Sequence, residues 1–212
     1  MVRHSALIVV AALTCGCVAT TKYTEPTEAA VANVKTVERP RAQVWDAVVP
    51  ELAKSFFVIN NVDRSSGLIN VSYSGNPRSY VDCGRVVIEN ATPQRPRVEF
   101  DGAAPSVTYE AIVPAGLLVA RGTMQRSMAL EGRVNLVLEE DGPTRTRVTA
   151  NVQYVLSRRL TATGQYGGSS QQVDTASFTS RSVGEFASAG SQPPLRCRST
   201  GEIERQVLEL VR

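Results

Sequence analysis

The chain has 212 residues, of which 42% are hydrophobic and 20% charged, and this length suits one domain with a sizeable core. Its 23 basic and 20 acidic residues leave a net charge of +3. The basic residues are spread along the chain, which argues against a nucleic-acid partner. The single histidine is His4. Residues 5–212 contain no histidine, which is the usual general base and a common metal ligand. Ser-His-Asp catalysis and most zinc sites are therefore excluded there, and we expect no cofactor.

The N-terminus predicts a secretory signal. An apolar run at Ser5–Leu13 follows a short basic start, and it is too short to span a bilayer. Gly16 directly before Cys17 resembles the bacterial lipobox, which implies a signal peptide over residues 1–16 and acylation of Cys17, with palmitate among the chains. Cleavage before Cys15 and an ordinary signal peptide remain alternatives.

The residues after Cys17 indicate location and domain boundaries. Val18 stands where enterobacterial lipoproteins retained at the inner membrane carry Asp, so the resemblance implies the periplasmic side of the outer membrane. Residues 17–33 are small and polar and predict a flexible lipidated tether. Residues 34–212 are predicted to form a single domain.

The first half of this domain predicts a helix followed by strands. Apolar residues on one helical face indicate a helix over Arg41–Ser55, interrupted or kinked at Pro50. Alternating residues on either side of a turn predict a β-hairpin from Phe56–Val62 and Leu68–Ser74. Shorter strands are expected at Tyr80–Ile88, Arg97–Phe100 and Val107–Val113.

The second half carries the clearest pattern. Apolar and polar residues alternate along Met124–Ser157 on both sides of a turn at Glu140–Thr144, which predicts a long antiparallel hairpin with one buried and one wet face. A mobile loop, a strand and a capped helix are expected next, at Leu160–Gln172, Val173–Ser180 and from Ser199 onwards. Together these elements predict an α+β fold in which an antiparallel sheet packs against an N-terminal and a C-terminal helix.

Two cysteines remain in the predicted domain, Cys83 and Cys197. An even pair in an exported chain predicts a disulfide. The bridge closes a long loop, for which chain-entropy arguments assign about 4–5 kcal/mol of stabilisation. A redox pair is the alternative, but the C-x-x-C spacing typical of such pairs is missing.

Candidate chemistry is sparse. The acidic run Glu139–Asp141 sits at a predicted turn, where solvated carboxylates are the simpler interpretation. Arg158 and Arg159 precede the predicted loop and are expected to form an exposed basic site that contacts a partner. No serine lies in a recognisable catalytic motif, so a hydrolase is the least favoured class.

A family resemblance rests on the run Arg39–Val49 with Trp45, followed by Phe57–Ile59 and Asp63–Tyr73. These residues resemble the repeat unit of BamC-like outer-membrane lipoproteins, in which a Trp-bearing helix precedes two strands joined by a Gly-containing turn. Two further segments resemble uncharacterised proteobacterial lipoproteins, Tyr80–Gly84 and Cys197–Glu204. The family implies a helix-grip-like domain and an accessory role at the β-barrel assembly machinery. This chain departs from it by having one domain and an expected disulfide.

The sequence therefore favours a non-enzymatic envelope lipoprotein, acting as a scaffold or accessory subunit of an outer-membrane protein complex. Its partners are expected to be the outer membrane, through the lipid anchor, and other envelope proteins. The alternative is a periplasmic carrier or sensor that binds a lipid or another apolar ligand between helix and sheet.

Overall fold

The computed structural model describes residues 20–89, 97–115, 118–189 and 192–212. The predicted signal peptide and the predicted lipidation site Cys17 lie outside the described residues. None of the helices in the described ranges is both long and apolar enough to cross a bilayer.

The described residues are mostly β-sheet, with 57% in strands, 14% in helices and three separate sheets. The prediction of a helix-grip-like α+β fold was therefore wrong. The prediction underestimated the strand content. Thr20–Thr24 of the predicted tether is a strand. The prediction of a mobile loop over Leu160–Gln172 was also wrong, because Leu160–Gly164 belongs to one strand and Ser169–Gln172 to the strand that pairs with it.

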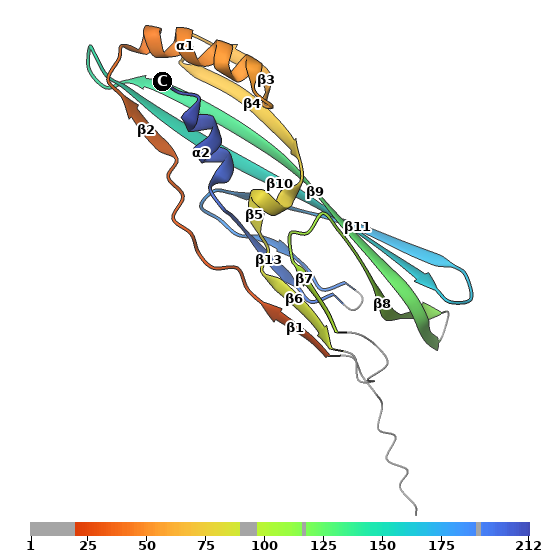
Figure 1. The fold of residues 1–212 in the computed structure, drawn as a ribbon. Helices are drawn as coiled ribbons and strands as arrows, with labels where there is room; N and C mark the ends of the chain where they lie inside the picture. The colour runs from red at the N-terminus through yellow and green to blue at the C-terminus, as the bar shows by residue number, and fades with distance from the viewer. Residues whose placement is uncertain (1–19, 90–96, 116–117, 190–191) are drawn as a thin grey trace, which may run out of the picture.

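The centre of the fold is a long hairpin of two strands, β9 (Leu118–Glu140) and β10 (Thr146–Gly164) (Figure 1). The two strands pair in one unbroken antiparallel register from Thr146–Glu140 to Gly164–Gly122. Along β10, buried and solvent-facing residues alternate as the sequence pattern predicts. The hairpin therefore has one face in the core and one face toward solvent.

Five further strands join the hairpin in a seven-stranded sheet. Two of them lie beside β9 along different stretches, and two lie beside β10 in the same way, while one extends the sheet at its edge. They are β4 (Leu68–Gly75) and β8 (Ser106–Ala115) beside β9, β2 (Val34–Val37) and β11 (Ser169–Thr179) beside β10, and β3 (Val58–Asp63) beside β4.

Two helices, α1 (Arg41–Lys54) and α2 (Glu202–Glu209), cover the inner face of this sheet (Figure 1). The apolar stripe of α1 is buried as predicted, and α1 continues through Pro50, which lies on its exposed side. Val48 and Leu52 of α1 and Leu136 of β9 are fully buried in the same core. The seam between helix and sheet is thus filled by side chains.

Two small sheets lie next to α2 and contribute apolar residues to the same core (Figure 1). One contains β1 (Thr20–Thr24), β6 (Arg85–Glu89) and β7 (Val98–Asp101), and the other contains β12 (Gly184–Phe186), β13 (Leu195–Ser199) and β5 (Val81–Asp82). A single 3-10 turn, Pro77–Ser79, precedes β5. The disulfide between Cys83 and Cys197 joins the β5–β6 junction to β13, and both cysteines are fully buried.

The predicted tether over residues 17–33 is not free in its described part. Thr20–Thr24 pairs with β6 as β1, and the hydroxyl of Tyr23 accepts a hydrogen bond of 2.9 Å from the backbone N–H of Arg196. Glu25 also forms an ion pair of 3.0 Å with Arg196. The start of the described chain is therefore attached to the small sheets.

Replacing both bridge cysteines, Cys83→Ala with Cys197→Ala, is expected to lower the free energy of unfolding by about 2–5 kcal/mol, because the unfolded chain gains conformational entropy. Urea unfolding of the wild-type and doubly substituted chains measures this difference. Equal unfolding midpoints would contradict a stabilising role for the bridge.

Candidate functional site

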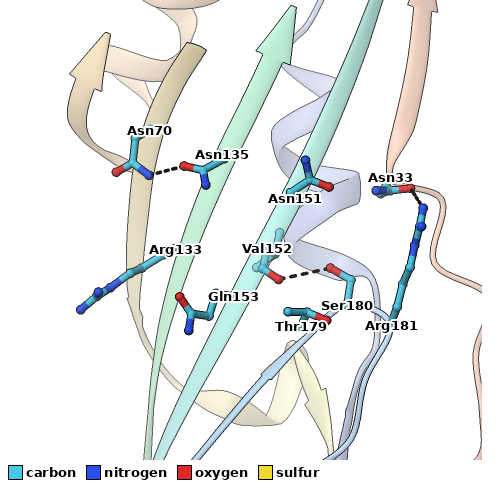
Figure 2. Close-up of a pocket in the computed structure, with 10 residues that line it drawn as sticks. All are labelled: Asn33, Asn70, Arg133, Asn135, Asn151, Val152, Gln153, Thr179, Ser180 and Arg181. Carbon is cyan, nitrogen blue, oxygen red and sulfur yellow. Dashed lines mark hydrogen bonds between the residues drawn. The ribbon is translucent and has the colours of Figure 1, made fainter.

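The outer face of the long sheet, opposite the helices, is polar. Figure 2 shows its side chains in front of the strands, with α2 behind them. A hollow of about 430 Å³ lies on this face. It is lined by Asn33, Asn70, Arg133, Asn135, Asn151, Val152, Gln153, Thr179, Ser180 and Arg181. We call this surface the amide face.

Asn70, Asn135 and Asn151 form a row across the amide face, and Asn60 extends it at the sheet edge; hydrogen bonds join Asn60, Asn70 and Asn135. Register places Asn70 beside Asn135 and Asn135 beside Asn151 on successive strands. Asn70 Nδ2 donates a hydrogen bond of 2.6 Å to Asn135 Oδ1, and Asn60 Nδ2 donates one of 2.9 Å to Asn70 Oδ1. A register shift in β3 between Ile59 and Asn61 accompanies the contact made by Asn60. Such a chain of hydrogen bonds fixes the orientation of its amides.

The hollow lies where the edge of β10 changes partners. β2 pairs with residues 146–149 of β10 and β11 pairs with residues 153–163. Between them, Asn33 O accepts a hydrogen bond of 2.8 Å from Ala150 N, and Val152 O accepts one of 3.4 Å from Ser180 N. The side chain of Asn33 also accepts a hydrogen bond of 3.3 Å from Arg181 (Figure 2). This change of partner forms one wall of the hollow.

The chemistry of the hollow is that of amides, hydroxyls and guanidiniums. Arg133 is partly neutralised, because its Nε donates a hydrogen bond of 2.8 Å to Glu131. Asparagine, glutamine, serine and threonine side chains do not ionise near neutral pH, and arginine stays protonated. The side chains that line the hollow therefore offer fixed hydrogen-bond donors and acceptors rather than an acid–base pair.

A second hollow, of about 400 Å³, lies further along the same face, and its lining includes Glu131, which accepts the hydrogen bond from Arg133 of the first hollow. It is more apolar, since Val58, Ala129 and Val155 contribute to its lining. Val58 is 61% exposed. The amide face thus continues into a mixed surface along β4, β9 and β10.

A buried polar cluster supports the amide face from behind. Glu204 of α2 is fully buried and accepts a hydrogen bond of 2.7 Å from the Tyr154 hydroxyl and another from Ser180. Ser199 donates a hydrogen bond of 2.7 Å to the same hydroxyl. Burial, followed by the nearby Glu204 carboxylate, raises the pKa of Tyr154. Because Ser180 also lines the hollow, this cluster positions its wall.

The structure separates the two arginines that were predicted to form one exposed site. Arg159 is exposed, but Arg158 is fully buried, so the prediction of an exposed Arg158 was wrong. The reason is its phase in β10, because Arg158 shares the inner face with Leu156 and Leu160. There its guanidinium pairs with Asp174 through Nε at 2.9 Å.

The acidic run at the hairpin turn is accounted for by ion pairs. Asp141 Oδ2 lies 2.8 Å from Arg145 Nε, and Glu140 Oε1 lies 3.4 Å from Arg41 Nε. Within the described ranges, no group of three or more His, Cys, Asp or Glu side chains is arranged to hold a metal ion. The amide face was not predicted as a site. Asn135 and Asn151 both occupy solvent-facing positions of the predicted hairpin, and this shared position was the one indication of the site in the sequence.

No protein-family profile, no curated protein and no solved structure matches the chain. The resemblance to BamC-like lipoproteins therefore stays a prediction from the sequence.

Tyr154→Phe is expected to lower the free energy of unfolding by about 1–3 kcal/mol, because it leaves the buried Glu204 carboxylate with one donor fewer. Tyr166→Phe is the matched control, since Tyr166 is 87% exposed and its change is expected to stay within about 0.5 kcal/mol. Chemical denaturation of both variants measures the difference. Indistinguishable stabilities for Tyr154→Phe and the wild type would rule out a supporting role for this cluster.

Proposed function

We propose that the chain is a non-enzymatic, lipid-anchored envelope protein that docks a partner protein on its amide face, as a scaffold or accessory subunit of an outer-membrane complex. The observation that carries the proposal is the row of asparagines hydrogen-bonded across strands beside a hollow of about 430 Å³. This row lies on the sheet face opposite the helices (Figure 2).

Amide side chains suit a polypeptide partner because each carries a donor and an acceptor, as a peptide group does. The hydrogen bonds from Asn60 to Asn70 and from Asn70 to Asn135 hold these groups in place, so they lose little freedom on binding. Arg181, whose side chain donates to the neutral Asn33, adds positive charge that fits a carboxylate of a partner, whereas Arg133 is already paired with Glu131.

A carrier of apolar ligands is less well supported. Such a carrier was expected to hold its ligand between helix and sheet, where Val48, Leu52 and Leu136 are fully buried in one core. The hollow on the amide face is lined mainly by polar side chains instead. A hydrogen-bonding partner therefore fits this face better than a lipid chain.

The lipid anchor completes the proposal. Cys17 precedes Thr20, the first residue of β1, by three residues, which span roughly 10 Å when extended. Because β1 is paired with β6, acylation of Cys17 would hold the small sheets close to the membrane surface. The domain would then act within a short distance of membrane-embedded partners.

Cys17→Ser is expected to move the protein from the membrane fraction to the soluble periplasmic fraction, because the acylated thiol is lost. Cys15→Ser is the matched control and is expected to stay with membranes. Immunoblotting of fractionated cells distinguishes the two. A Cys17→Ser protein that still fractionates with membranes would contradict the anchor.

Site-specific photocrosslinking in intact cells tests the docking surface. A photoreactive residue at Gln153, in the hollow, is expected to give a defined crosslinked species, whereas the same residue at Gln43, on the exposed side of α1, is expected to give none. Asn135→Asp keeps the acceptor for Asn70 but removes the Nδ2 donor and adds charge. It is expected to reduce the Gln153 crosslink about tenfold, the equivalent of about 1.4 kcal/mol.

Asn76→Asp is the control for this substitution, because Asn76 also uses its Oδ1 as an acceptor, toward Arg78 N, but lies outside the hollow. Equal crosslinking from Gln153 and Gln43, or an unchanged Gln153 crosslink in Asn135→Asp, would refute docking on the amide face.

A further inference from the structure

Two arginines lie inside the fold, on the face of the sheet opposite the amide face. Arg126 of β9 and Arg158 of β10 are both fully buried. Arg126 stands opposite Leu160 and Arg158 stands opposite Met128, so the two arginines are diagonal neighbours on one face. Diagonal neighbours in an antiparallel pair are about 7–8 Å apart, which brings two positive charges close together.

Arg158 has a direct counter-charge. Its Nε and Nη2 hold both carboxylate oxygens of Asp174, with the Nε contact at 2.9 Å. Nη2 also donates a hydrogen bond of 2.8 Å to Ala187 O, and the ring of Phe186 lies 4.8 Å from the guanidinium carbon. One carboxylate therefore neutralises one of the two guanidiniums.

Arg126 is held by neutral groups. Its Nη2 donates to Gly102 O and its Nη1 donates to Ala104 O at 3.4 Å, while the ring of Phe100 lies 5.6 Å from the guanidinium carbon. Burial, together with the charge of Arg158, lowers the pKa of Arg126 to about 10. Arg126 is therefore still protonated at neutral pH. Within the described part of the chain no carboxylate accepts a hydrogen bond from it, and Asp101 and Asp174 act on it only electrostatically.

Each guanidinium also keeps a buried donor without a partner. Arg126 Nε and Arg158 Nη1 are both enclosed and make no hydrogen bond with any residue that the structure describes. A buried charge is costly unless it is paired, and a buried donor is costly unless it is satisfied. A water molecule would satisfy only the donors, whereas an anion would satisfy them and also add negative charge beside two guanidiniums of which one alone bonds a carboxylate directly.

We propose that the two guanidiniums form an internal binding site for a small monovalent inorganic anion of the size of chloride. The anion accepts hydrogen bonds from Arg126 Nε and Arg158 Nη1 and supplies the missing negative charge. The site lies on the inner face, away from the amide face, and is independent of the proposed docking function.

Thermal unfolding of the full chain in detergent tests this site, with sodium chloride exchanged for sodium gluconate at constant ionic strength. A bound anion stabilises only the folded state, so the unfolding midpoint is expected to rise saturably with chloride by roughly 3–6 °C. Arg126→Met is expected to abolish the rise. Arg159→Met, which removes an exposed charge on the other face, is expected to retain it.

Equal midpoints in the two salts, or the same chloride dependence in Arg126→Met, would overturn the proposal. The wild-type chain provides a second test that does not depend on how Arg126→Met folds. Crystals grown in sodium bromide are expected to show an anomalous peak within hydrogen-bonding distance of Arg126 Nε and Arg158 Nη1. Water density or no peak between these atoms would also overturn it.

Discussion

The register of the long β9–β10 hairpin is the constraint on which the other features depend. The two strands pair without a break from Thr146–Glu140 to Gly164–Gly122. Because side chains alternate between faces, a slip of one residue would turn Leu136 and Leu138 outward and Asn135 inward. Packing of the fully buried Leu136 and Leu138 therefore also fixes the row of asparagines on the other face.

The two faces have different roles as a consequence. The inner face carries α1, α2 and the small sheets, with the Cys83–Cys197 bridge holding two of their segments together. It also carries two buried arginines, whose charges need compensation within the core. The outer face presents fixed amides and a hollow. The packed core and the proposed docking surface thus lie on opposite sides of one sheet.

Local patterns in the sequence predicted the long hairpin, the helix of α1 and the cysteine pair, because alternation, helical periodicity and cysteine count act over short distances. The α+β fold class failed because segments without apolar alternation, such as Thr20–Thr24 and Ser169–Gln172, become strands only through pairing with β6 and β10. Arg158 was misplaced although its phase with Leu156 predicts an inward side chain. The amide face depends on register between distant strands, which no single segment specifies.

Hydrogen–deuterium exchange on the chain, alone and within its native membrane complex, tests the central claim most directly. Docking on the amide face predicts that the partner slows exchange in outer-face peptides of β4, β9 and β10 around Asn70, Asn135 and Asn151, while α1 and α2 exchange as before. Protection confined to the helices, or identical exchange in both states, would contradict the account.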